Sequence, residues 1–100
     1  MGHEIGSRVG ALLNIDGKRK TINLLGYGRY LGDKVPPHNV SPFLNQAEIP
    51  NPKLKLDDGS IVWGCECWWG SESEIQGVVK RYHTGGFQIV NVTIRAAEAA

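Results

Sequence analysis

The sequence predicts an α+β domain, a small antiparallel β-sheet or half-barrel with one packed amphipathic helix. Several short apolar runs are separated by glycine and Asp-Gly turn signals, whereas only residues 72–83 repeat apolar side chains at helical spacing. Many strands with one helix are typical of an antiparallel sheet that a helix covers. A chain of 100 residues has room for a single domain, which we place over residues 1–100.

The first part of the chain, residues 8–32, is rich in predicted strands. Asp16-Gly17 lies between two apolar runs, and Asp-Gly in that setting is a strong signal for a β-hairpin. A third extended piece begins at Gly26 and is punctuated by further glycines. We therefore expect three strands here, of which the first two are antiparallel neighbours.

Residues 34–52 are Pro-rich and predict a long loop. The segment holds all five prolines of the chain. A connection of this length without regular structure is uncommon in compact domains, and it often serves function or is held in an assembly. A floppy surface excursion is an equally good interpretation.

Residues 53–69 predict a second hairpin. Asp57-Asp58-Gly59 is a turn signal between a short strand and a longer run, residues 60–69. Alternate residues of the longer run would face opposite sides of the sheet. One face would carry Ile61, Trp63, Cys65, Cys67 and Trp69, and the other Val62, Glu66 and Trp68.

The two cysteines of the chain, Cys65 and Cys67, fall on this predicted strand. Residues two apart on a strand point the same way, but they are poorly placed for a disulfide with each other. We expect reduced, packed thiols. A Cys-x-Cys pair can also begin a metal site, but a closed zinc site needs four ligands and the three histidines show no paired spacing. We therefore expect no metal.

The end of the chain predicts a helix and a last strand. Ser71 followed three residues later by Glu74 is the pattern of a capping box, which places the helix at residues 72–83. Two glycines end it, and a strand over residues 87–95 follows. The tail, residues 96–100, would extend the chain as a frayed helical end.

Composition excludes several classes of function. The 11 Lys and Arg against 10 Asp and Glu give a net charge of +1, too small for the basic field that binding of a DNA or RNA polymer requires. No apolar run is long enough to span a membrane, and the first ten residues lack the features of a signal peptide. We expect a cytoplasmic protein without a membrane partner.

The residues favour a binding protein over an enzyme. No nucleophile elbow, phosphate loop or metalloprotease motif is present, so we expect no catalysis and no cofactor. Glu66 could act as a lone general acid, but an ordinary carboxylate on a strand is the better interpretation because acid–base sites need positioned partners.

Polar groups on the last strand suggest a ligand site. Asn91, Thr93 and Arg95 would place an amide, a hydroxyl and a guanidinium in one row, a set suited to ribose hydroxyls and phosphate. Trp68 could stack on a base or could cover an oligomer seam. Further candidate anion contacts are Arg8, Arg29 and Lys80, although for each of these and for Arg95, taken alone, a solvated surface role is the better interpretation.

The segments GYGRYLGDKVPP, LDDGSIVWGCECWWG and NVTIR together resemble the phage-encoded Thoeris anti-defence family of nucleotide-signal sponges. The resemblance implies a non-enzymatic protein that captures the cyclic ADP-ribose isomer made by a bacterial TIR-domain defence enzyme, in the host bacterial cytoplasm. It also implies a homo-oligomer, with dimers that assemble into hexamers, and separate pockets for cyclic oligonucleotides. The resemblance further implies Trp68 or Trp69 as the adenine stacker and Thr93 with Arg95 as ribose and phosphate contacts.

Two other functions remain open. A protein-interaction inhibitor could use the aromatic surface and the Pro-rich loop. A small hydrolase acting on a cyclic nucleotide could use Glu66 or His83 as its base.

Overall fold

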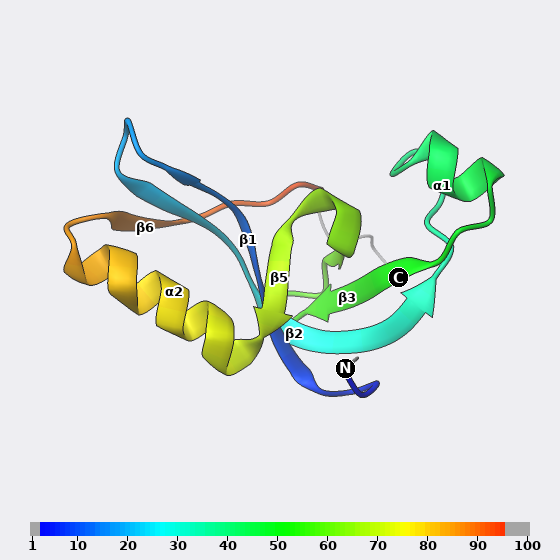
Figure 1. Ribbon diagram of the computed structural model, residues 1–100, viewed down its shortest axis with the longest axis horizontal. Coiled ribbons are helices and arrows are strands. Elements are labelled where there is room, and N and C mark those ends of the chain that lie inside the picture. The colour runs from blue at the N-terminus through cyan, green and yellow to red at the C-terminus, as the bar shows by residue number, and fades with distance from the viewer. Residues whose placement is uncertain (1–2, 96–100) are drawn as a thin grey trace.

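A two-stranded ribbon, β1 (Arg8–Asp16) and β2 (Thr21–Lys34), runs through the computed structural model, which describes residues 3–95. Figure 1 shows helix α2 (Glu72–Thr84) along one end of the ribbon and the short helix α1 (Pro42–Gln46) at the opposite end. The architecture confirms the predicted α+β class with one packed helix. The remaining elements are β3 (Asn51–Leu56), β4 (Ile61–Trp63), the 3-10 turn η1 (Gly64–Glu66), β5 (Trp68–Ser71) and β6 (Gln88–Asn91).

Two strands share one edge of β2. The sheet order is β4-β3-β2-β1-β5, and each of these neighbours is antiparallel. β6 pairs in parallel with Thr21–Leu24 of β2, whereas β3 pairs with β2 from Gly28 onward. Since β1 occupies the other edge of β2, β6 and β3 lie on the same edge and leave residues 25–27 between them. The parallel direction of β6 differs from the purely antiparallel sheet that we expected.

The β1–β2 hairpin turns where the sequence predicts. Oδ1 of Asp16 accepts hydrogen bonds from the backbone N–H groups of Lys18 and Arg19, each at 3.0 Å, and so closes the turn. The expected third strand is wrong as a separate element, because β2 continues unbroken to Lys34. The glycines that suggested a boundary bend the strand instead of ending it. At Gly26, φ is +138°, a value that side chains rarely permit.

Two compensating bulges lie next to this bend. Ala11 pairs with Gly26 and Leu12 pairs with Leu24, so Leu25 of β2 has no partner on β1. One step further along β1, Leu13 is likewise skipped. Each bulge inserts one residue and turns the following side chains relative to the sheet.

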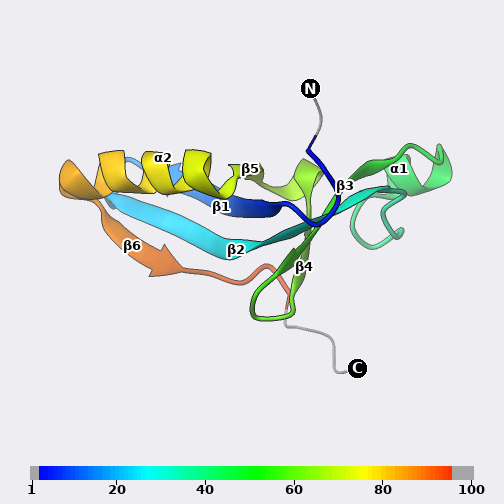
Figure 2. The ribbon, with the colours of Figure 1, turned by 90° about the horizontal axis from the view of Figure 1, so that it is seen from below.

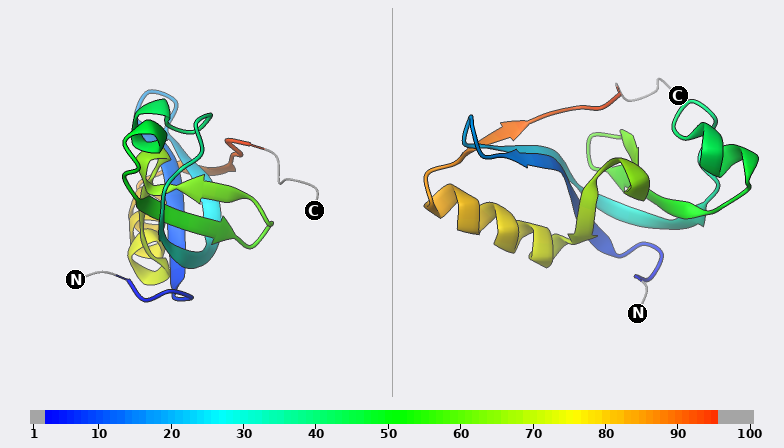
Figure 3. Two further views of the ribbon diagram at one scale, coloured as in Figure 1. Left: turned by 90° about the vertical axis from the view of Figure 1, so that its right-hand side faces the viewer. Right: turned by 45° about the horizontal axis from the view of Figure 1, so that its top comes forward.

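Side chains from opposite faces of the ribbon fill two cores. The strand core comprises Val9, Ala11, Leu25, Tyr30, Leu54, Leu56 and Val62, and the helix core comprises Leu12, Ile22, Leu24, Ile75 and Val79. Figure 2 shows α2 on one side of the ribbon and β6 on the other. The left view of Figure 3 shows the β3–β4 hairpin and the chain after β6 projecting to the same side.

Helix α2 begins and ends at the predicted signals. The Ser71 hydroxyl accepts the N–H of Glu74 at 3.2 Å, and the Glu74 carboxylate accepts the Ser71 hydroxyl at 2.8 Å. Ile75 and Val79 are the buried residues of the helix. Close packing on β1 depends on Gly10, because a Cβ there would lie 2.8 Å from the Cβ of Ile75.

The prediction of one continuous loop over residues 34–52 is wrong. Ser41 caps a short helix by accepting the N–H of Leu44 at 3.1 Å, and Pro42 occupies its first turn, where a missing N–H costs nothing. β3 then begins at Asn51, inside the predicted loop. α1 buries none of its residues, so neither periodicity nor apolar content marks it in the sequence.

The predicted strand over residues 60–69 is also wrong, because η1 interrupts it after Trp63. Val62 and Trp63 are both buried, at 2% and 4% exposure, although they were expected on opposite faces. Cys65 is exposed instead of packed, whereas Cys67 is half-buried against the strand core. The carboxylate of Glu66 accepts the N–H of Trp63 at 3.1 Å and so stabilises the turn.

The last strand is shorter than the predicted residues 87–95, because β6 ends at Asn91. Val92 and Ile94 still pack against the strand core, and Thr93 between them is exposed. The expected helical tail at residues 96–100 lies outside the described residues. Within residues 3–95, neither helix has the length and apolar character that crossing a bilayer requires.

Candidate ligand-binding site

Trp68 and Trp69 point to opposite faces of β5. Trp69 pairs with Ala11 of β1 and packs against the strand core, whereas Trp68 pairs with Leu12 and remains 50% exposed. The ring of Trp69 stacks on the buried Tyr30, with centroids 5.7 Å apart and planes at 16°. Trp68 is therefore the indole that a ligand can reach, and Trp69 is already stacked within the fold.

A second aromatic ring approaches Trp69 from the N-terminal segment. The His3 imidazole lies 4.8 Å from the Trp69 ring between centroids. On its other side, Gly64 of η1 leaves room for the indole, because a Cβ there would lie 2.9 Å from Nε1 of Trp69. These contacts fix Trp69 as part of the packing between β5 and η1.

Arg95 lies against Glu66. Its Nη1 and Nη2 atoms donate to the two carboxylate oxygens of Glu66 at 2.6 and 2.7 Å, and Nη2 also donates to the carbonyl of Ile61 at 3.1 Å. The Glu66 side chain is only 14% exposed and that of Arg95 is 34% exposed. A two-point ion pair of this kind joins the end of the described chain to η1.

These hydrogen bonds hold the Glu66 carboxylate in place, and its charge acts on the two neighbouring cysteines. Glu66 accepts hydrogen bonds from both Arg95 and the N–H of Trp63, so its two oxygens are engaged. Burial, together with the Glu66 charge, raises the pKa of Cys67 to about 12. Partial desolvation and the neighbouring Glu66 charge also raise the pKa of Cys65, although its side chain is exposed. Both thiols therefore stay protonated at neutral pH, where a thiol is a poor nucleophile.

Arg8 lies between two carboxylates. It donates to both oxygens of Asp57 at 2.7 and 2.8 Å and to Oε2 of Glu72 at 2.7 Å. Hydrogen bonds to Asp57 and Glu72 raise the pKa of Arg8, and the hydrogen bonds from Arg8 lower the pKa of Asp57. Arg29 pairs with Arg8 across the ribbon and donates to the carbonyl of Gly6 at 2.8 Å.

The structure thus divides the predicted site residues into groups. Trp69 and the segment that carries Thr93 and Arg95 lie on the strand-core face. Arg8 and Arg29 meet at the β3–β4 turn. Lys80 is exposed on α2, which covers the opposite face, so the structure does not bring it to the other cations.

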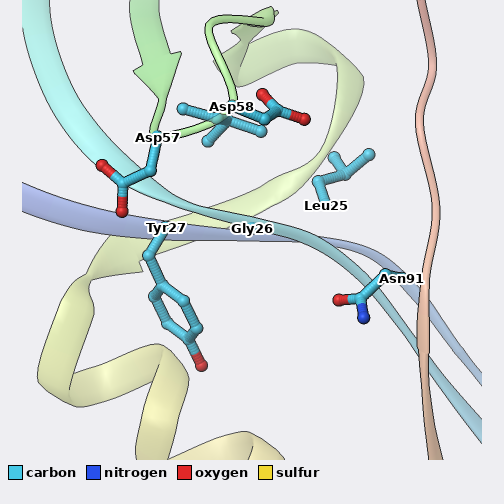
Figure 4. A pocket seen from close by; sticks show the side chains of 7 residues that line it. Leu25, Gly26, Tyr27, Asp57, Asp58 and Asn91 are labelled. Carbon is cyan, nitrogen blue, oxygen red and sulfur yellow. The ribbon is translucent and has the colours of Figure 1, made fainter.

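Asn91 lines a hollow of about 240 Å³ that the sequence did not indicate. We call it the split-edge pocket, because it lies on the edge of β2 between the part that pairs with β6 and the part that pairs with β3. Figure 4 shows Leu25 between the side chains of Asp58 and Asn91, with the Tyr27 ring turned away towards α2. The pocket is lined by Leu25, Gly26, Tyr27, Leu56, Asp57, Asp58 and Asn91.

Asp58 is the residue of this pocket that sequence reasoning missed. It was assigned to a turn, and its Oδ1 does accept the N–H and the hydroxyl of Ser60, at 2.8 and 2.6 Å. These hydrogen bonds lower the pKa of Asp58. A turn signal gives no sign that β6 brings Asn91 to the lining of the same pocket.

The described residues 3–95 contain no group of three or more His, Cys, Asp or Glu side chains placed to hold a metal ion. Comparisons with protein-family models, with curated proteins and with solved structures found no match to this chain.

Proposed function

We propose that this chain is a non-enzymatic binding protein that captures a cyclic nucleotide immune signal, so that a phage evades a TIR-based bacterial defence. The proposed ligand is a cyclic ADP-ribose isomer, and cyclic oligonucleotides are further candidates. Two lines of reasoning support the proposal: the sequence resemblance to the Thoeris anti-defence sponges, and the half-exposed Trp68.

Trp68 is the observation that carries the proposal. Its indole is 50% exposed although its backbone is held in β5 against Leu12. An exposed ring on a fixed strand is ready to stack on a base without first being ordered, and such stacking is worth about 1–3 kcal/mol. Trp69 contributes by holding β5 against Tyr30.

Arg95 and Thr93 are the proposed phosphate and ribose contacts. Arg95 is paired with Glu66, so a phosphate that reaches it competes with a carboxylate already in place. Binding of phosphate at Arg95 therefore requires the guanidinium to turn from Glu66 or to be shared with it. A ligand would then loosen the contact between η1 and the segment after β6.

Trp68 lies on the opposite face of β5 from the segment that carries Thr93 and Arg95, so one chain does not bring the three side chains together and a second copy would have to complete the site. Nanomolar capture needs about −12 kcal/mol, which one base stack and one Arg contact do not supply. Several apolar side chains remain exposed and available for contact between copies, and subunit interfaces commonly enclose ligands. The most exposed are Ile5 and Phe43, each at 72%, and Trp68 at 50%.

Native mass spectrometry tests the proposal. The protein would be measured as purified and after incubation with the products of a TIR-domain enzyme. We expect a dimer or hexamer that gains the mass of an intact ADP-ribose isomer and releases it unchanged on heating. Release of a cleaved product would instead support a hydrolase, and an oligomer that never gains a nucleotide would contradict capture.

A protein-interaction inhibitor is the second candidate. The segment around α1 favours it, since no residue of α1 is buried and Phe43 is 72% exposed. A stable complex with a protein partner on gel filtration, formed without nucleotide and lost in Phe43→Ser, would support this function. Leu13→Ser serves as the matched control, because it removes an exposed aliphatic side chain on β1 and leaves the aromatic residues and α1 unchanged.

A further inference from the structure

We infer that the split-edge pocket is a binding site for an amino-substituted heterocycle, such as the base of an adenine nucleoside, and that it excludes phosphate. The inference is independent of the signal-capture proposal, because Trp68, Thr93 and Arg95 do not line this pocket. It rests on the shape of the sheet edge and on the two polar side chains that flank it.

The pocket exists because one edge of β2 changes partner. Pairing with β6 ends at Leu24, opposite Asn91, and pairing with β3 starts at Gly28, opposite Leu56. Backbone hydrogen bonds continue one step beyond each of these points, from the N–H of Val92 to the carbonyl of Leu24 at 2.9 Å and from the N–H of Asp57 to the carbonyl of Tyr27 at 2.8 Å. The edge without a neighbouring strand is therefore short and centres on Leu25 and Gly26, which with Tyr27 form the wall of the pocket. A flat group can lie there, edge-on to the backbone, in the space that a strand would otherwise fill.

The lining next to this wall suits a flat, mostly apolar ring. The small exposed parts of Leu25 and Leu56, 7% and 4% of these residues, are apolar, and Gly26 carries no side chain that would narrow the space. The volume of about 240 Å³ is below the roughly 300–1,000 Å³ of pockets that enclose whole drug-sized ligands. The pocket therefore holds one heterocycle and leaves the rest of the ligand outside.

Two polar groups flank the ring position. Oδ1 of Asp58 is engaged by Ser60, whereas Oδ2 has no hydrogen-bond partner among residues 3–95. The side-chain amide of Asn91 likewise makes no hydrogen bond within that part of the chain, and it can both donate and accept. Adenine presents an amine donor and several ring-nitrogen acceptors around its edge, so the amine can donate to the Asp58 carboxylate on one side of Leu25 while a ring nitrogen accepts from the Asn91 amide on the other.

The charge of the pocket excludes phosphate. Both Asp57 and Asp58 have a lowered pKa, so both are ionised at neutral pH. Arg8 compensates the charge of Asp57, whereas the hydrogen bonds to the Asp58 carboxylate come from neutral groups, the N–H and hydroxyl of Ser60 and its own backbone N–H. No lysine or arginine lines the pocket. A phosphate here would face an uncompensated carboxylate, whereas an amine would be attracted to it.

Two nucleosides that differ only in the amine provide the test. The full chain, labelled with ¹⁵N, is titrated by NMR with adenosine and with purine riboside, which lacks the exocyclic amine. We expect adenosine to shift the backbone amides of Gly26 and Gly59 and the side-chain amide of Asn91. We expect purine riboside to bind about tenfold more weakly, the loss of one hydrogen bond to a charged group.

Three variants separate binding from folding. Asp58→Asn keeps an oxygen for Ser60 but removes the charge, and we expect it to weaken adenosine binding about tenfold and to reduce the preference over purine riboside. Asn91→Leu keeps the size of the side chain and tests the amide. Asn39→Leu, at an exposed asparagine before α1, is the matched control and should bind adenosine like the unmodified chain.

Several outcomes would overturn the inference. Equal affinity for adenosine and purine riboside would show that the exocyclic amine does not contribute to binding. Shifts at Gly26 and Gly59 that do not saturate by about 10 mM adenosine would show that no site exists. Tighter binding of inorganic phosphate at the same amides would contradict the charge argument, and displacement of adenosine by arginine amide would assign the pocket to a guanidinium instead. Capture of a cyclic nucleotide at Trp68 could succeed or fail in any of these cases.

Discussion

The guanidinium of Arg8 and the carboxylate of Asp57 form a two-point ion pair, with hydrogen bonds of 2.7 and 2.8 Å, that joins the first strand to the β3–β4 turn. The same guanidinium reaches Glu72 at the start of α2. One side chain therefore connects three elements that are far apart in the sequence. Its partners also set how the stability of the fold responds to acid.

Asp57→Asn should make unfolding less dependent on pH. Because Arg8 lowers the pKa of Asp57 in the folded state, the carboxylate stabilises the fold fully above its unfolded pKa of about 3.9. That contribution is lost as the pH falls through the lower folded value. The difference in unfolding free energy between variant and unmodified chain should be largest at neutral pH and shrink below about pH 4.

Urea unfolding at a series of pH values measures this difference. Glu48→Gln, which removes an exposed carboxylate after α1, is the control and should leave the pH dependence unchanged. A constant difference across the acid range would show that the Arg8–Asp57 pair does not couple to folding.

The neighbouring tryptophans should respond differently to removal. Trp69→Ala empties a half-buried position stacked on Tyr30 and should lower the unfolding free energy by about 3 kcal/mol. Trp68→Ala removes a ring that is 50% exposed and should cost less than about 1 kcal/mol of unfolding free energy, while weakening nucleotide capture by about 5- to 150-fold. Chemical unfolding and calorimetric titration measure the two effects. The assignment of faces would be wrong if Trp68→Ala were the more destabilising change.

Loss of the Arg95–Glu66 pair should destabilise the segment after β6, residues 92–95, more than it destabilises α2. Glu66→Gln removes the negative charge from the Arg95–Glu66 pair and weakens the contact with the N–H of Trp63, at a cost of roughly 1–3 kcal/mol. Hydrogen exchange should quicken at the amide of Val92, which donates to Leu24 at 2.9 Å. Exchange in α2 should stay unchanged at the control residue Val79, since α2 packs on the other core.

Two glycines offer a matched pair of alanine substitutions with opposite signs. Gly10→Ala places a Cβ 2.8 Å from both Ile75 and Tyr27, and overpacking should cost about 1–3 kcal/mol. Gly77→Ala meets nothing within 4 Å on α2 and should stabilise the helix by about 0.5–1 kcal/mol. Thermal unfolding measures both, and a neutral Gly10→Ala would mean that the helix lies further from β1 than described.

The sequence predicted the elements whose signals are local. Asp16-Gly17 marks its hairpin because the turn depends on neighbouring residues, and Ser71 with Glu74 marks the start of α2 for the same reason. The strand over residues 60–69 failed because an apolar run with alternating polarity does not reveal that Glu66 folds back on Trp63. α1 escaped prediction because it has no buried face to impose a pattern on its residues.

The candidate site was less predictable than the fold. Trp68 and Trp69 differ in how far their side chains are exposed, and this difference depends on which face of β5 packs against the core. The pairing of Arg95 with Glu66 joins residues that only the tertiary fold brings together. Asp58 and Asn91 line one pocket because β6 runs parallel to β2, a direction that no residue pattern in the last strand encodes.

During synthesis, β6 is made well after the part of β2 with which it pairs. Residues 21–24 of β2 emerge from the ribosome early, but the strand that covers their open edge lies near the other end of the chain. Until β6 has been synthesised, the apolar, β-prone edge of β2 is exposed to other nascent chains, and such exposure can lead to aggregation. Fragments that stop before Gln88 lack the strand that covers this edge, and we expect them to aggregate more readily than a chain that contains β6.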